Sequence, residues 1–177
     1  MSLTSHFELM AVYNQGMNQR LYQVAAQLTP EQLSKARGAF FDSIIGTLNH
    51  IVVGDVIWLK RFANHPNHFS SLDSVRSMPS PNALDAVLYD RLSDLEEVRM
   101  HLDRIIVEFA AELDDDVLAS PLLFNNMKGK PNKKQLGYLV QHFFNHQTHH
   151  RGQASTLLYQ VGLDVGITDL LIDIPNE

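Results

Sequence analysis

Four of the nine histidines lie in the stretch "HFFNHQTHHRGQ", residues 142–153. An α-helix turns ~100° per residue, and on such a helix His146 and His150 lie at the edge of, or within, the apolar stripe. His142 and His149 lie progressively farther from it. Side chains four residues apart lie one turn apart on the same face, so His146 and His150 are placed to hold one metal ion.

A third ligand is predicted in the stretch "GTLNHIVVGD", residues 46–55, because His50 has the most apolar surroundings of any histidine. Gly46 lies four residues before it and Gly54 four residues after it. Glycine inside a helix costs ~1 kcal/mol relative to alanine, so this pair indicates that space is needed there. Two interpretations are open: the glycines leave room for a ligand or substrate, or they allow close helix–helix packing.

The chain contains no cysteine, which excludes disulfides, thiolate metal sites and a cysteine nucleophile. A metal ion must then be held by nitrogen and oxygen ligands, and three neutral imidazoles suit Zn, Ni or Fe(II). Three protein ligands leave one position open for water or substrate, which is typical of a catalytic site. The zinc-protease motif HExxH is absent, because Gln147 follows His146 where that motif has glutamate.

Four further residues are expected near these ligands. A ligating histidine usually donates its second N–H to an oxygen, and Gln153, three residues after His150, is a candidate acceptor. His142 is predicted to lie beside the site without binding the ion. Asp55 lies in a very apolar helix and needs a partner, either Arg151 or a histidine of the last helix. The alternative for Asp55 is a purely structural ion pair.

The whole chain limits the classes of function. Its 177 residues fit one domain, residues 1–177, and the formal net charge of −6 argues against nucleic-acid binding. No apolar run reaches the ~20 residues that span a bilayer, and the first residues do not resemble a signal peptide. We therefore expect a cytoplasmic protein that acts on a small molecule, without nucleic-acid or membrane partners.

Apolar periodicity and helix breakers predict four long helices, over residues 4–28, 42–63, 83–113 and 133–161. A short helical turn is expected after Thr29, a loop over residues 64–82, and a short hairpin over residues 118–132. The predicted fold class is therefore all-α, a four-helix bundle.

The stretches "LNHIVVGDVIWLKRF" and "HFFNHQTHHRGQ" resemble those of the DinB family, which includes the YfiT-like metalloenzymes. The resemblance covers nearly the whole chain and implies a bundle with up-down-down-up topology. It also implies a divalent metal bound by His50, His146 and His150. Some members of the family are transferases that use a low-molecular-weight thiol as cosubstrate, and homodimers are common among them.

Three hypotheses for function follow. In the first, the metal ion binds a small thiol and directs it at a small electrophile, as in a thiol S-transferase. In the second, a hydrolase or isomerase uses metal-bound water. In the third, the protein is a non-enzymatic metal-binding protein of the stress response, in which the ion mainly ties the second helix to the fourth.

Overall fold

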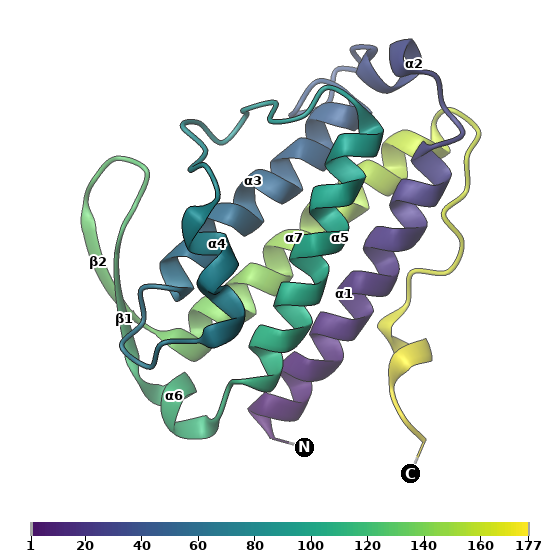
Figure 1. Cartoon of the computed structure of the whole chain (residues 1–177). Coiled ribbons are helices and arrows are strands. Elements are labelled where there is room, and N and C mark those ends of the chain that lie inside the picture. The colour runs from purple at the N-terminus through teal and green to yellow at the C-terminus, as the bar shows by residue number, and fades with distance from the viewer. Residues whose placement is uncertain (1, 177) are drawn as a thin grey trace.

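The computed structural model describes residues 2–176. Its four long helices are α1 (Leu3–Ala25), α3 (Ile44–Phe62), α5 (Leu92–Ala111) and α7 (Leu136–Tyr159). Figure 1 shows α1 and α7 running in one direction and α3 and α5 in the other, in the order up-down-down-up. Helix α1 packs against α5 and α7, and α3 packs mainly against α7. The predicted all-α bundle is confirmed.

Three of the helices begin directly after a residue whose side chain caps the helix N-terminus. The hydroxyl groups of Ser2, Thr29 and Ser43 accept hydrogen bonds from backbone N–H groups in the first turns of α1, α2 (Pro30–Ser34) and α3. These contacts satisfy donors that would otherwise have no partner at a helix N-terminus. The short helix α2, with proline at its first position, is the helical turn that was predicted after Thr29.

The third long helix is shorter than predicted. It begins at Leu92 rather than near residue 83, and residues 83–91 form an irregular segment. The cause lies in α3: the side chain of Asn49 accepts hydrogen bonds from the N–H groups of Leu88 and Tyr89 and donates to the carbonyl of Tyr89. These tertiary contacts replace the helical hydrogen bonds that the apolar periodicity favours. Val87, which would face the core if the predicted helix began near residue 83, is 60% exposed.

The connections contain more structure than the sequence indicated. The expected loop over residues 64–82 contains the 3-10 turn η1 (Ser70–Leu72) and the short helix α4 (Asp73–Ser77), because Leu72 and Val75 are fully buried. The predicted hairpin is present as antiparallel strands β1 (Pro121–Asn125) and β2 (Pro131–Gln135), preceded by α6 (Asp115–Ala119).

The C-terminal tail runs back along α1 and contains the 3-10 turn η2 (Leu170–Asp173) (Figure 1). Two hydrogen bonds attach it to α1: the Tyr13 hydroxyl donates to the carbonyl of Thr168, and Arg20 donates to the carbonyl of Ile167. Leu163 and Val165 pack against the core. The tail therefore forms part of the packed structure.

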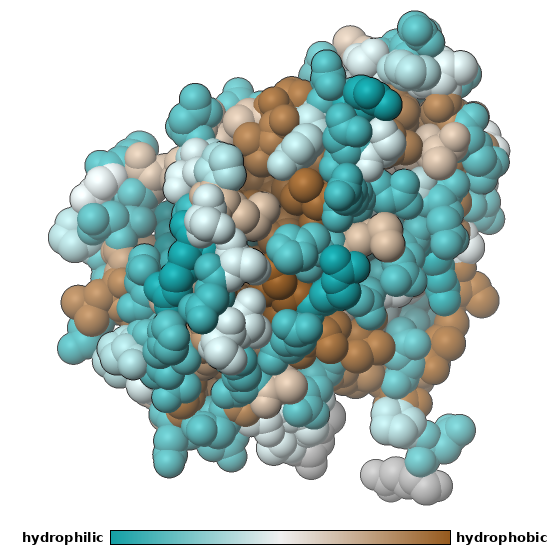
Figure 2. Space-filling model, viewed as in Figure 1, coloured by the Kyte–Doolittle hydropathy of each residue, from teal (hydrophilic) through white to brown (hydrophobic). Residues whose placement is uncertain are grey.

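The face in Figure 2 is mostly hydrophilic, with a band of apolar side chains between α4 and α5 and further apolar side chains toward both edges. Among residues 2–176, no helix combines the length and the apolar character needed to cross a bilayer.

The bundle core contains a network of buried charges. The carboxylate of Asp55 on α3 accepts a hydrogen bond from Arg99 of α5, and another from Gln147 of α7 at 2.8 Å. Arg99 also lies 3.0 Å from the carboxylate of Asp103, which accepts a hydrogen bond of 2.8 Å from Asn18 of α1. All five side chains are at most 2% exposed. The network therefore connects all four long helices.

Replacing Arg99 by methionine is expected to destabilise the fold strongly. The change leaves Asp55 and Asp103 buried without their cation, and breaking a buried ion pair costs ~3–5 kcal/mol. Urea unfolding followed by circular dichroism measures the free energy of unfolding. Arg104→Met, at an exposed position of the same helix, is the matched control and should change it by less than about 0.5 kcal/mol. Equal stability of the two variants would contradict this account of the network.

Candidate metal centre

The three predicted histidines converge in the structure. The Nε2 atom of His50 lies 3.2 Å from Nε2 of His146 and 3.1 Å from Nε2 of His150. One ring nitrogen from each lies within 4.8 Å of the other two, so the three side chains could hold one metal ion. His50 is buried, and His146 and His150 are partly buried. The group therefore joins α3 to α7 at a point that solvent still reaches.

The second ring nitrogens indicate which tautomers are present. Nδ1 of His50 lies 2.7 Å from the carbonyl oxygen of Leu84, which can only accept, so Nδ1 carries the proton. Nδ1 of His150 lies 2.7 Å from Oε1 of Gln153 and donates in the same way. In the neutral rings, Nε2 of both histidines is then unprotonated and carries a lone pair. Two lone pairs face each other at 3.1 Å with no proton available to join them.

His146 is positioned by packing rather than by hydrogen bonding. Its Nδ1 atom is buried and has no hydrogen-bond partner among the described residues. Its ring lies against the backbone of Gly54, where a Cβ atom would come within 2.6 Å of Cε1 of His146. Gly54 therefore permits the close approach of α7 to α3 that brings His146 to His50. Of the two interpretations of this glycine, the structure supports close helix–helix packing.

Gly46 has a different role. A Cβ atom there would lie 2.2 Å from the carbonyl oxygen of Phe41, in the segment that precedes α3. This close approach places the Phe41 ring on His50, with centroids 3.7 Å apart and planes inclined by 16°. The same ring meets His150 edge-on at 5.5 Å. Gly46 thus makes room for a backbone segment that covers one side of the three histidines.

Burial keeps the histidines neutral. Burial, followed by the charges of the other histidines, lowers the pKa of His146 to about 3. Burial is also the main cause that lowers the pKa values of His50 and His150. Neutral imidazole is the form that binds metal ions, so the three rings are ready to act as ligands at neutral pH.

The remaining predicted residues lie as follows. Gln153 holds His150, as expected. His142 packs edge-on against Trp58 at 5.1 Å, and its ring centroid is 6.2 Å from that of His146, outside the group of three. His149 is exposed and lies 3.3 Å from the amide nitrogen of Gln153.

Asp55 pairs with a residue other than the two kinds of partner predicted for it. We expected Arg151 or a histidine of the last helix, but the ion pair is made with Arg99 of α5. Arg151 donates instead to Asn14 and Thr148. The sequence contains a feature that indicates burial of Arg99. Leu95, Arg99 and Asp103 are spaced by four residues, so Arg99 and Asp103 lie on the same buried helix face as Leu95.

Two other contacts were missed, those from Phe41 and from the carbonyl of Leu84. A backbone carbonyl has no signature in sequence, and Phe41 lies in a segment without periodicity. Only the folded chain brings them to His50.

Gly54→Ala is expected to displace His146 and to lower the stability of the fold. The added Cβ has no space, whereas alanine at an open helical position is favoured over glycine by ~1 kcal/mol. Gly16→Ala on α1 is the matched control, because no atom lies within 4 Å of the Cβ position there. The melting temperature should fall for Gly54→Ala and rise slightly for the control. An unchanged His146 ring resonance in Gly54→Ala would contradict the packing role.

The metal-free protein should lose stability as the pH falls below ~6.5, the ordinary pKa of histidine. Between that value and about 3, the unfolded chain binds a proton on His146 that the folded chain does not. The contribution of neutral His146 to the stability of the fold is therefore complete above pH ~6.5 and declines as the pH falls below that value. Melting temperatures between pH 7.5 and 5 in the presence of a chelator measure this loss.

His146→Gln, which cannot titrate, is the comparison for that measurement. Its melting temperature should fall less than that of the wild type over the same range. The difference isolates His146, because both proteins contain the same carboxyl groups, including Asp103, whose pKa burial raises to about 6. Parallel curves would contradict the prediction.

The chain is similar to known proteins along most of its length. The sequence profile of the DinB family matches residues 1–176. The chain is 24% identical over 162 residues to Protein DinB of Bacillus subtilis (strain 168), an alignment that covers 89% of this chain and 87% of that protein. No solved structure matches the chain at a significant level. With the family profile matched along nearly its whole length, the chain belongs to the DinB family.

Proposed function

We propose that the protein binds one divalent metal ion through Nε2 of His50, His146 and His150, and that it is a metal-dependent transferase of a small thiol. The observation that supports metal binding most directly is the contact between His50 and His150. Two unprotonated nitrogens 3.1 Å apart repel each other unless a cation lies between them. The hydrogen bonds to Leu84 and Gln153 hold both rings in this orientation.

The spacing of the nitrogens also suits a metal ion. Two ligands with Zn–N bonds of ~2.0–2.1 Å in tetrahedral geometry are separated by ~3.3 Å. The distances of 3.1 and 3.2 Å from His50 to its two partners are close to this value. Three imidazoles are compatible with Zn, Ni and Fe(II).

The thiol proposal rests on what the chain lacks and on the family to which it belongs. There is no cysteine in the sequence, so no protein thiolate competes for the ion and a reacting thiol must come from a cosubstrate. A bound divalent ion would supply a lower pKa for that thiol and a fixed position for it. In the transfer, an S–C bond forms, the leaving group departs with its electron pair, and the thiol proton passes to solvent.

The surroundings favour a small electrophile with an apolar part. The Phe41 ring covers one side of His50. The ring of Phe40 packs edge-on against the Phe41 ring, with centroids 4.9 Å apart, and Phe40 is 87% exposed. A pocket of about 390 Å³ lies between Phe40 and the helix face that carries His149 and Gln153. An electrophile in that pocket would lie next to the residue that orients His150.

The test combines metal content with turnover. Untagged wild-type protein is expected to contain about one equivalent of metal by mass spectrometry, and His50→Ala should lose it. Wild-type protein is then assayed with a panel of small electrophiles and several low-molecular-weight thiols. Turnover should require a thiol and should fall at least ~100-fold in His146→Ala, because loss of one ligand disrupts the site.

His101→Ala is the matched control, since His101 lies on α5 outside the group of three. It should keep both metal and activity. Equal metal content in wild type and His50→Ala would refute the metal site. Turnover without any thiol would favour a hydrolase or isomerase instead. One equivalent of metal with no turnover, and a large fall in melting temperature on chelation, would favour a non-enzymatic metal-binding protein.

Three expectations accompany this proposal: a homodimer, a cytoplasmic location and a function in the stress response. They rest on the family resemblance and on composition, and they stay predictions.

A further inference from the structure

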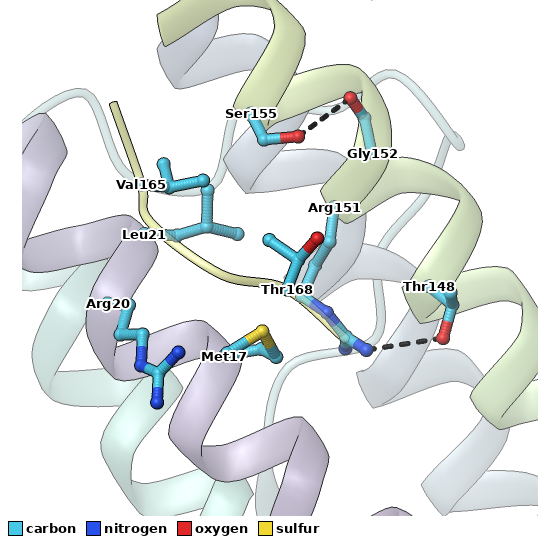
Figure 3. A pocket seen from close by; sticks show the side chains of 9 residues that line it. All are labelled: Met17, Arg20, Leu21, Thr148, Arg151, Gly152, Ser155, Val165 and Thr168. Atoms are coloured by element: carbon cyan, nitrogen blue, oxygen red, sulfur yellow. Dashed lines mark hydrogen bonds between the residues drawn. The ribbon is translucent and has the colours of Figure 1, made fainter. Parts of the chain in front are cut away.

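A second pocket lies between α1, α7 and the C-terminal tail. It has a volume of about 170 Å³, and the tail residues Val165 and Thr168 close one side of it (Figure 3). Its floor is apolar, with Met17 and Leu21 of α1. The pocket reaches α7 at Arg151, which is about 140° around the helix from His146, so it opens on a different face from the histidines.

The charged groups of this pocket are all positive. Its lining includes Arg20 and Arg151 but no acidic residue among those that the structure describes. Arg20 is exposed and donates one hydrogen bond to the carbonyl of Ile167 in the tail. Arg151 is only 6% exposed, and Figure 3 shows its side chain reaching past Thr168, with the guanidinium group next to Thr148.

Arg151 is a buried cation without an acid beside it. In the described part of the chain it forms no ion pair with a carboxylate. Its neighbours are neutral: it donates to the amide oxygen of Asn14 and, at 3.2 Å, to the hydroxyl of Thr148, and its guanidinium carbon lies 5.4 Å from the centroid of the Tyr13 ring. A buried charge is costly unless an opposite charge or several hydrogen bonds compensate it.

The core network compensates Arg151 only indirectly. Asn14 also donates to Asp103 at 3.3 Å, so an amide separates the arginine from that carboxylate. Asp103 and Asp55 are both in direct contact with Arg99. A guanidinium group has five N–H donors, and the contacts with Asn14 and Thr148 occupy two of them. Donors therefore remain for a ligand in the pocket.

We propose that this pocket binds a small organic carboxylate with a compact apolar body, whose carboxylate group accepts hydrogen bonds from Arg151. The planar guanidinium matches the two oxygens of a carboxylate. The apolar body lies against Met17, Leu21 and Val165. A volume of about 170 Å³ is similar to that of a cavity of about 150 Å³ that admits benzene, which sets the size of the ligand near that of benzoate.

Binding of benzoate to the full-length protein as purified tests the proposal. Calorimetry measures affinity, and backbone amide resonances of Met17, Val165 and Thr168 report the place of binding. Benzamide has the same shape without the charge and should bind at least ~10-fold more weakly, because hydrogen bonds to a charged group contribute ~1.5–3 kcal/mol. Inorganic phosphate, which lacks the apolar body, should not displace benzoate.

Two variants distinguish an effect on ligand binding in the pocket from an effect on the stability of the core. Arg151→Met should weaken benzoate binding ~10-fold or more, but it also removes contacts inside the bundle. Ser155→Leu leaves Arg151 in place and fills the pocket, because Ser155 lines it and its hydroxyl only donates to the carbonyl of Gly152 in the same helix. This variant should abolish binding. Gln141→Leu, at an exposed position ~20 Å along α7, is the matched control and should bind as the wild type does.

His146→Ala distinguishes this site from the metal centre, since a carboxylate can also ligate a metal ion. Benzoate binding should persist in His146→Ala, whatever the metal content of that variant. Loss of binding there, equal affinity for benzamide, displacement by phosphate, or unchanged binding in Ser155→Leu would each overturn the proposal. So would the absence of any response at Met17, Val165 and Thr168.

Discussion

The carboxylate of Asp55 fixes the relative positions of three helices. It is fully buried on α3 and accepts hydrogen bonds from Arg99 of α5 and Gln147 of α7. A buried carboxylate is tolerated only with such partners, because its desolvation costs several kcal/mol. Burial raises the pKa of Asp55, and the contacts with Arg99 and Gln147 oppose that change. The pairing therefore restricts how α3, α5 and α7 can slide or rotate against one another.

The three histidines depend on this restriction through adjacent residues. Gly54 directly precedes Asp55, and His146 directly precedes Gln147. The hydrogen bond between Asp55 and Gln147 thus fixes the register of α3 and α7 one residue away from the contact between Gly54 and His146. In a three-ligand site the positions of the nitrogens determine which ion fits, so this register matters for the candidate metal centre as well as for stability.

Helix α7 carries both proposed sites, on two different faces. One carries His146 and His150 toward α3, and the other carries Arg151 toward α1 and the tail. The two faces share the core network: Gln147 contacts Asp55, while Arg151 contacts Asn14, which contacts Asp103. The buried network therefore lies next to both faces of α7.

The sequence by itself determined the four amphipathic helices, the short hairpin and the histidines His50, His146 and His150, because helical periodicity and capping residues are local properties. It did not determine the start of α5, since Asn49 binds the backbone of residues 88 and 89 from another helix. It also did not determine the partner of Asp55, the ring of Phe41 on His50, or the carbonyl of Leu84 that sets the tautomer of His50. These contacts join residues far apart in the chain, and only tertiary packing decides them.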